Sequence, residues 1–139
     1  MLAGFGEAYG LSQPQAIALG RPLGGGMGMA QVCGAVSGAL MILGLAQEAD
    51  PQGEAATRQR VQTRARQLRE EFSRRRGSAL CRDILGVDIS TPEGRGQAVE
   101  QGLFVKVCPG VVAEAARLLE EMLARPAQPP ADPARSQVV

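Results

Sequence analysis

Hydrophobic residues recur at helical spacing along most of the chain, and this pattern predicts an all-α fold. Residues 54–76 have their apolar positions spaced by four, three and four, as expected for one face of a long amphipathic helix. These positions are Val61, Ala65, Leu68 and Phe72. A last helix is predicted from Pro109 to about Ala124, with an apolar face made of Val111, Ala115, Leu118 and Met122.

The most apolar stretch, residues 29–46, predicts a helix rich in glycine and alanine. Glycine costs roughly 1 kcal/mol in a helix interior, so Gly34, Gly38 and Gly44 should each have a packing or functional reason. The stretch carries no charge, and Gly34 and Gly38 have a spacing found between membrane helices. Its convincingly apolar part, residues 32–46, has the length of a buried core helix. We therefore expect a packed central helix and no membrane span.

Shorter helices are predicted around these three. Residues 1–9 read as the last turns of a helix, and Ser12 can cap a second helix over residues 14–19. A short helix is expected over residues 79–85. Residues 87–107 are mixed, with a turn expected at Thr91-Pro92-Glu93-Gly94 and a short helix or strand after Gly102.

The end of the chain differs in composition from the rest. Residues 125–139 are rich in proline, and such segments do not bury enough apolar surface to fold. We predict one helical domain over residues 1–124, a compact bundle around the Gly/Ala-rich central helix. A disordered tail over residues 125–139 is expected to follow it.

Composition narrows the chemistry further. The 139 residues include 15 basic and 14 acidic side chains and no histidine. Without histidine, Ser-His-Asp and Cys-His arrangements are excluded, so any chemistry must use thiols, carboxylates, arginines or backbone groups.

The near balance of charge gives no general attraction to nucleic acid, and the arginine run of residues 58–76 is expected to be a solvated helix face. An odd number of cysteines without a recognisable secretory leader favours a cytoplasmic protein.

The three cysteines are the candidate reactive residues. Cys33, Cys81 and Cys108 all fall near predicted helix N-termini, where the helix dipole favours a negative charge by about 0.3–1 kcal/mol. Such positions lower a thiol pKa and favour the nucleophilic, metal-binding thiolate. The alternative is that the thiols are buried as small hydrophobic side chains, and the pattern alone leaves both interpretations open.

The glycine-rich segment before the central helix is a second candidate. Its backbone N–H groups could face an anion, although the Lys-Ser/Thr pair of a P-loop is absent. Alternatively, the glycines only let the chain turn sharply. The candidate cofactor-binding residues are Gly24, Gly25, Gly26 and Gly28.

These motifs together resemble those of the C-GCAxxG-C-C family, small redox-active bacterial and archaeal proteins related to the cysteine-rich domain of split-Soret cytochromes. The resemblance covers residues 1–124 and rests on the glycine segment, on the CGAVSG motif that starts at Cys33, and on Cys81-Arg82 and Cys108-Pro109. It implies a helical fold and either an iron–sulfur cluster or a thiol/disulfide pair. No C-x-x-C-H motif is present, so no haem is expected. The family's first signature cysteine has no counterpart here, and three thiolates do not complete a four-cysteine cluster within one chain.

The leading hypothesis is a bacterial, cytoplasmic, cysteine-dependent redox or metal-binding protein; whether it is an enzyme stays open. We expect Cys33, Cys81 and Cys108 to converge in one electropositive pocket as catalytic residues or as metal ligands. The alternative is a non-catalytic helical interaction module whose cysteines are structural. An electron-transfer or transport-associated protein is the expected partner, a homodimer is left open, and no nucleic acid is expected.

Overall fold

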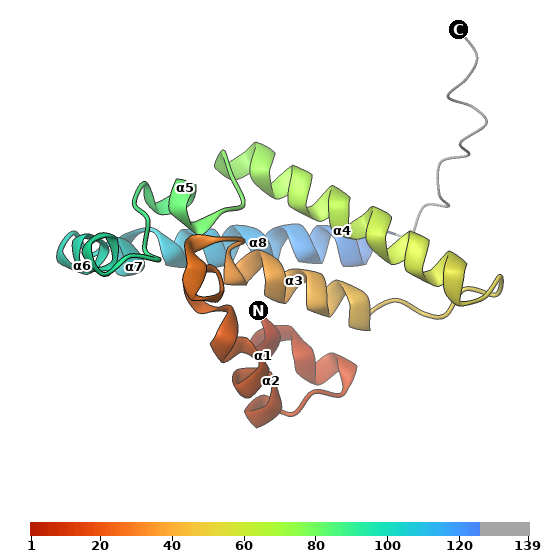
Figure 1. The fold of residues 1–139 in the computed structure, drawn as a ribbon. Helices are drawn as coiled ribbons and strands as arrows, with labels where there is room; N and C mark the ends of the chain where they lie inside the picture. Colours follow the sequence, from red (N-terminus) through yellow and green to blue (C-terminus); the bar gives the residue numbers. More distant parts are fainter. Residues whose placement is uncertain (126–139) are drawn as a thin grey trace, which may run out of the picture.

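Helices separated by short turns make up residues 1–125, the part of the chain that this computed structural model describes (Figure 1). The all-α prediction is confirmed. In chain order the helices are α1 (Leu2–Phe5), α2 (Gln13–Gly20), α3 (Gly34–Leu45), α4 (Glu54–Arg76), α5 (Cys81–Leu85), α6 (Pro92–Glu100), α7 (Leu103–Lys106) and α8 (Cys108–Ala124). The predicted tail lies outside the described residues from residue 126 onwards.

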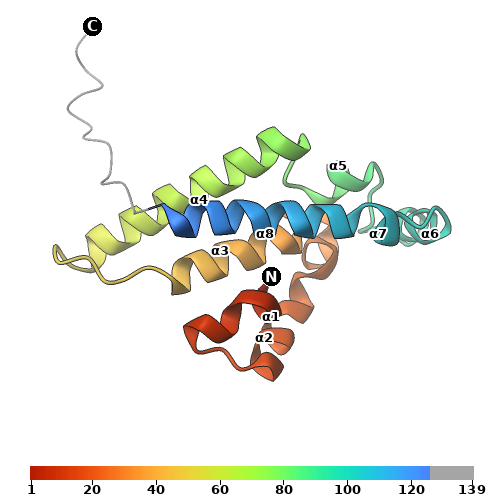
Figure 2. The same ribbon diagram turned by 180° about the vertical axis from the view of Figure 1, so that it is seen from behind.

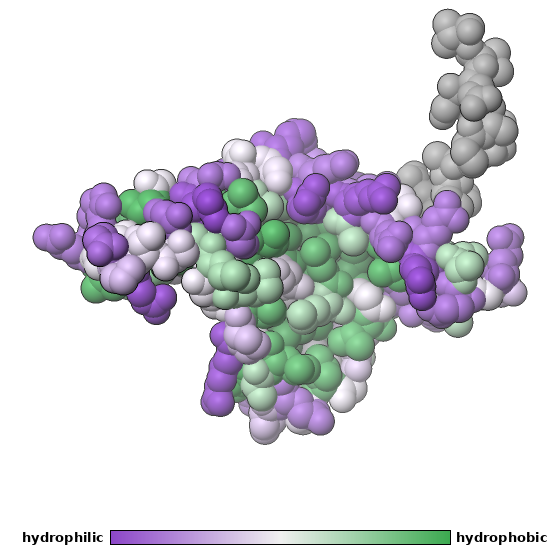
Figure 3. All heavy atoms as spheres, viewed as in Figure 1, coloured by the Kyte–Doolittle hydropathy of each residue, from purple (hydrophilic) through white to green (hydrophobic). Residues whose placement is uncertain are grey.

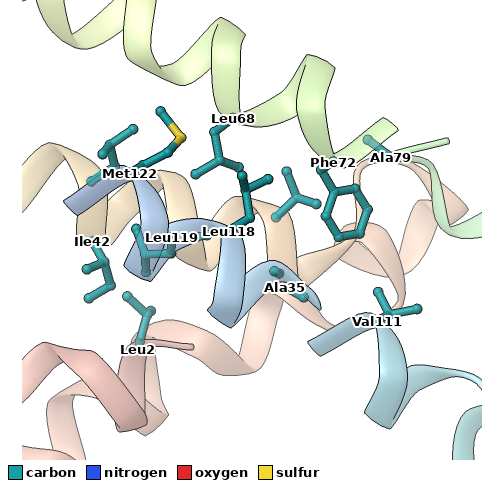
Figure 4. Close-up of a cluster of buried hydrophobic side chains, with 14 of the residues drawn as sticks. Leu2, Ala35, Ile42, Leu68, Phe72, Ala79, Val111, Leu118, Leu119 and Met122 are labelled. Carbon is teal, nitrogen blue, oxygen red and sulfur yellow. The ribbon is translucent and has the colours of Figure 1, made fainter. Parts of the chain in front are cut away.

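Three long helices, α3, α4 and α8, form the core. Each contacts the other two, and both ribbon views show α8 running along the seam between α3 and α4 (Figures 1 and 2). Their facing sides bury a contiguous set of apolar side chains (Figure 4). The largest fully buried ones are Phe72, Ile42, Leu43, Leu68, Leu119, Val36 and Val111.

The two predicted apolar stripes face this core. All four predicted positions of α8 are buried, and Leu68 and Phe72 of α4 have no exposed surface. Val61 and Ala65 are half-buried nearer the start of α4. The helical periodicity of the sequence therefore identified the core sides of both helices.

The arginine run of α4 is partly built into the fold. Arg75 pairs with Glu71 of its own helix at 2.6 Å and with Glu114 and Glu121 of α8 at 3.0 and 2.7 Å. The buried Arg64 side chain donates a hydrogen bond to a backbone carbonyl of α8. The expectation of a wholly solvated face is therefore wrong for these two arginines, which hold α4 against α8.

The N-terminal helices α1 and α2 form a hairpin that contacts α3 on the side away from α4 (Figures 1 and 2). Gly10, with φ 83°, ends the turn that follows α1. The backbone N–H of Ser12 donates to Oε1 of Gln15 at 3.0 Å, which starts α2. The two short helices predicted from this segment are confirmed.

The central helix α3 begins later than the sequence predicts. It starts at Gly34 with Cys33 as its N-cap, whereas a start near Met29 was expected. Residues 25–28 are left-handed, with φ between 60° and 72°, and Ala30 has φ 52°. A right-handed helix does not continue through such residues. This shift makes Cys33 the N-cap of the helix.

Close packing explains two of the three glycines in α3. A Cβ on Gly34 would lie 2.5 Å from the Leu23 carbonyl oxygen, and one on Gly38 would lie 2.8 Å from the Met1 Cβ. A Cβ on Gly44 would meet no atom within 4 Å. The packing expectation is therefore wrong for Gly44, which lies one residue before the end of the helix.

The mixed segment after α5 is helical. Thr91 caps α6, its Oγ1 accepting a hydrogen bond from the Gly94 N–H at 3.0 Å. The residues expected to form a turn therefore open a helix, because threonine followed by proline is also a helix-start signal. The segment after Gly102 forms α7, so the helix alternative was the correct one there.

One face of the molecule exposes apolar surface over α3 and the adjoining α1–α2 hairpin, whereas α4 and α6 are mainly hydrophilic (Figure 3). The large apolar residues exposed on α2 are Ile17 and Leu19, and those exposed on α3 are Met41 and Leu45. Within residues 1–125, no helix is both long enough and apolar enough to cross a membrane.

Candidate functional site

Three cysteine side chains line one cavity with a volume of about 300 Å³. Cys33 is the N-cap of α3, and Cys81 and Cys108 are the first residues of α5 and α8. All three are free thiols. The prediction that each cysteine lies at a helix N-terminus is confirmed, and the structure brings the three together. Their assignment as catalytic or metal-binding residues stays a prediction.

Apolar side chains form the rest of the cavity wall. Leu23 and Ile89 line it together with Phe104 of α7 and with Val111 and Val112 of α8. Within residues 1–125, no Asp, Glu, Lys or Arg side chain lines this cavity. The electropositive character expected here was that of helix N-termini, and backbone N–H groups at the start of α3 do act to lower the pKa values of Cys33 and Cys81.

An isolated antiparallel β-bridge positions two of the thiols. Val32 pairs with Leu80, the Cys33 N–H donates to the Ala79 carbonyl at 2.8 Å, and the Cys81 N–H donates to the Gln31 carbonyl at 2.8 Å. Side chains alternate between the two faces of such a pairing. Cys33 and Cys81 each follow one residue after the bridge, so both thiols lie on its same face.

Cys33 carries the most acidic thiol of the site. Its pKa is lowered from 9.0 to about 6, chiefly because its sulfur accepts a hydrogen bond from the Cys81 thiol. The N–H groups of Ala35 and Val36 lower this pKa further, although the side chain closes no complete capping hydrogen bond. Partial burial acts in the opposite direction and is outweighed. Of the three thiols, Cys33 is therefore the one that most readily forms a thiolate.

The pKa values of the other two thiols are raised. The pKa of Cys81 is raised, first because its thiol donates to Cys33, then by burial and by the negative charge on Cys33. Burial raises the pKa of Cys108, and the charge on Cys33 adds to this effect. The expectation that all three helix termini lower a thiol pKa is wrong for Cys81 and Cys108, because one thiolate opposes the ionisation of its neighbours.

The glycine-rich segment contributes only part of its predicted residues to the cavity. Gly24 and Gly25 line it. Gly26 is instead required by the turn itself, since a Cβ there would lie 2.5 Å from backbone atoms of Gln31. Gly28 is exposed, and it does not line the cavity. The cofactor-binding assignment of all four glycines stays a prediction, and the structure gives Gly26 and Gly28 roles in chain turning.

Arg82 connects this segment to the thiols, a role that the sequence pattern does not reveal. Its Nε donates to the Ala30 carbonyl and its Nη2 to the Met29 carbonyl, each at 3.3 Å. The next residue on its N-terminal side is Cys81. These hydrogen bonds therefore connect the end of the mainly left-handed segment, residues 25–30, to the start of α5.

The described residues do not fit a metal centre held within one chain. In residues 1–125, no three cysteine or carboxylate side chains are placed to share one metal ion. An iron–sulfur cluster usually takes four thiolates, and the rest of the cavity wall is apolar. The iron–sulfur prediction therefore gains no support from the geometry.

The apolar members of the wall could not be identified from the sequence. Leu23, Ile89 and Phe104 come from short helices and turns without a long periodic pattern, so no signal separated them from ordinary core residues. Val111 was predicted, but only as a core residue of the last helix. The cysteines were identified because their residue type and helix-start positions both indicate chemistry.

Comparison with known proteins gives one match. The family model described as "Putative redox-active protein (C_GCAxxG_C_C)" matches residues 1–122. Neither a curated protein nor a solved structure matches the chain significantly.

Proposed function

The chain belongs to the C_GCAxxG_C_C family, and from this premise we propose that it is a thiol–disulfide redox protein in which Cys33 and Cys81 form the reactive pair. Cys33 is the attacking thiolate, and Cys81 is the resolving thiol. The co-reactant is a disulfide, which the protein reduces while its own two thiols are oxidised.

The observation that carries the proposal is that the Val32–Leu80 bridge holds Cys33 and Cys81 on one face, where both thiols line the same cavity and each shifts the pKa of the other. A thiolate is the nucleophile in disulfide exchange, and its rate is best when its pKa is close to the ambient pH. The bridge also holds the second thiol beside the first. A lone reactive cysteine would lack this built-in resolving group.

In the first step, the Cys33 thiolate attacks one sulfur of the disulfide R–S–S–R. The new bond joins Cys33 to RS, the old S–S bond breaks, and the other sulfur leaves as RS⁻. Cys33 is then neutral, and its sulfur no longer attracts the thiol proton of Cys81 as a thiolate does. The main cause of the raised pKa of Cys81 disappears with that charge, so its proton can pass to the leaving RS⁻.

In the second step, the Cys81 thiolate attacks Cys33 Sγ. The Cys33–Cys81 disulfide forms, and the second RS⁻ leaves and takes a proton from water. Two electrons have moved from the protein thiols to the substrate, and two RSH molecules are released. The charge on Cys33 keeps Cys81 protonated until the first step is complete, which sets the order of the two attacks.

The alternative of a helical interaction module requires a free small-residue face on α3. Ala35 and Ala39 are buried in the core, and Gly34 and Gly38 lie against Leu23 and Met1 of the same chain. These contacts favour internal packing over partner binding at that face.

A redox titration of the full chain tests the proposal. The reduced protein is equilibrated in dithiothreitol buffers of increasing oxidised fraction, its remaining thiols are alkylated after acid quenching, and the products are mapped by mass spectrometry. We expect one two-electron transition that yields the Cys33–Cys81 disulfide. Cys33→Ser and Cys81→Ser should abolish it, whereas Cys108→Ser should retain it. A main product that joins Cys108 to another cysteine, or no intramolecular disulfide under oxidising conditions, would contradict the proposal.

A further inference from the structure

The cavity around the reactive pair has a wall chemistry that selects among disulfides. Besides the three thiols, its side chains are apolar, and within residues 1–125 none of those lining it is charged. We propose that the cavity takes small, uncharged disulfides with short apolar arms, an assignment that rests on the proposed function. Peptide-like disulfides with several charged groups, such as glutathione disulfide, would be excluded.

Size supports this assignment. A volume of about 300 Å³ is at the lower end of the range of small-molecule sites. It accommodates a disulfide with short alkyl arms, whose arms would contact Leu23, Ile89 and Phe104. These side chains surround the thiols from three separate elements of the chain, so the arms would be enclosed on several sides.

Charge supports it independently. A charged group that enters an apolar wall loses its hydration, and this cost is recovered only if a partner of opposite charge is present. The one charge among the described lining side chains is the Cys33 thiolate, and its attack on the disulfide consumes that charge, so a charged arm keeps no partner in the wall. An acidic substrate would also be repelled by the Cys33 thiolate.

Val112 is the exposed side chain among the described residues that line the cavity, so we place the entrance beside it. This side chain lines the cavity and is 44 % exposed, whereas its neighbour Val111 is 1 % exposed. Val112 is therefore the position where a new charge would meet an incoming disulfide with the least damage to the core. Val105, which is 79 % exposed on α7 and does not line the cavity, provides a matched control.

Three disulfides whose arms share a three-atom chain from sulfur test the proposal: dipropyl disulfide is apolar, cystamine is cationic and dithiodipropionate is anionic. The rate of Cys33–Cys81 disulfide formation is measured with each for the folded chain. The rate of thiol loss in the urea-unfolded chain is measured in parallel. The ratio of the two rates removes the intrinsic reactivity of each reagent. We expect this ratio to be at least about tenfold higher for dipropyl disulfide than for either charged reagent.

Substitutions at the entrance give the second readout. Val112→Lys should raise the ratio for dithiodipropionate, and Val112→Glu should raise the ratio for cystamine, each by about threefold or more. Val105→Lys should leave all three ratios within twofold of the wild type.

The outcomes separate this inference from the proposed function. Equal ratios for the three reagents, or Val112 variants that behave like Val105→Lys, would overturn the substrate assignment while the Cys33–Cys81 couple stands. A chain that forms no Cys33–Cys81 disulfide with any reagent, or in the dithiothreitol titration, would overturn both.

Discussion

The thiols of Cys33 and Cys81 line one cavity and perturb each other's pKa, although the two residues belong to different halves of the chain. The β-bridge between Val32 and Leu80 fixes this relationship by placing both side chains on one face. The coupling lowers the pKa of Cys33 and raises that of Cys81. The acidity of Cys33 is therefore a property of the pair.

Removing the donor should raise the pKa of Cys33. In the wild type, the rate of Cys33 alkylation by iodoacetamide should rise with pH about a midpoint near 6. In Cys81→Ala the midpoint should move upward toward the ordinary thiol value, because the largest cause of the lowered pKa is absent. Peptide mapping after timed alkylation over a pH series measures both midpoints.

Cys81→Ser is the matched control, because a serine hydroxyl can still donate to the thiolate. Its midpoint should lie below that of Cys81→Ala. Equal midpoints in the two variants would mean that the hydrogen bond has no part in the acidity of Cys33.

The stability of the reduced protein should depend on pH through Cys33. Its folded pKa of about 6 lies below the ordinary 9.0, so folding favours the thiolate. The resulting stabilisation is complete above pH 9, declines as the pH falls toward 6, and is lost below that value. Urea unfolding of the wild type and of Cys33→Ser at several pH values gives the difference in free energy of unfolding. A difference that stays constant between pH 9 and 5 would contradict this linkage.

Alanine substitutions at two glycines of α3 should change the free energy of unfolding in opposite directions. Gly34→Ala forces a Cβ against the Leu23 carbonyl at 2.5 Å, and we expect a loss of about 1–3 kcal/mol. Gly44→Ala meets open space and should stabilise the helix by up to about 1 kcal/mol. Chemical denaturation of both variants tests the pair. Destabilisation by Gly44→Ala would show that its small size has a role after all.

Replacing Met27 by glycine should raise the stability of the protein. It has φ 60° and ψ 32°, a left-handed conformation that an L-residue adopts at a cost of roughly 1–2 kcal/mol. Part of that gain is offset by the greater freedom of glycine in the unfolded chain, so Met27→Gly should stabilise by about 0.5–1 kcal/mol. Thermal unfolding measures the change.

Met29→Gly provides the comparison, because Met29 is similarly exposed but does not have a positive φ. This variant should lose stability by a similar amount. If both variants destabilise the protein, the left-handed turn is not strained at Met27.

Local sequence pattern was sufficient for some elements and insufficient for others. The predicted range of α4 is the observed one because an unbroken apolar stripe lies between glycines, and Gly77 has the left-handed conformation of a helix stop. The start of α3 was missed because the partner that holds Cys33, the Ala79 carbonyl, comes from a distant segment. A contact of that kind leaves no periodic signal near residue 33.

The candidate site was likewise predictable only in part. Residue type and helix-start positions were enough to select the three cysteines. The opposite pKa shifts of Cys33 and Cys81 could not be predicted, because they depend on which sulfur faces which donor after folding. The uncharged wall was also missed, since Phe104 and Ile89 join the site only through tertiary packing.

The Val32–Leu80 bridge also has a consequence during synthesis of the chain. When a ribosome has extended the polypeptide only through α3, Cys33 has neither its backbone partner at residue 79 nor its sulfur partner at residue 81, and it behaves as an ordinary, weakly acidic thiol. Its reactive form arises only after the second segment has emerged and docked. Under the proposed function, the nascent protein therefore has no activated nucleophile until the cavity that contains Cys33 has been assembled.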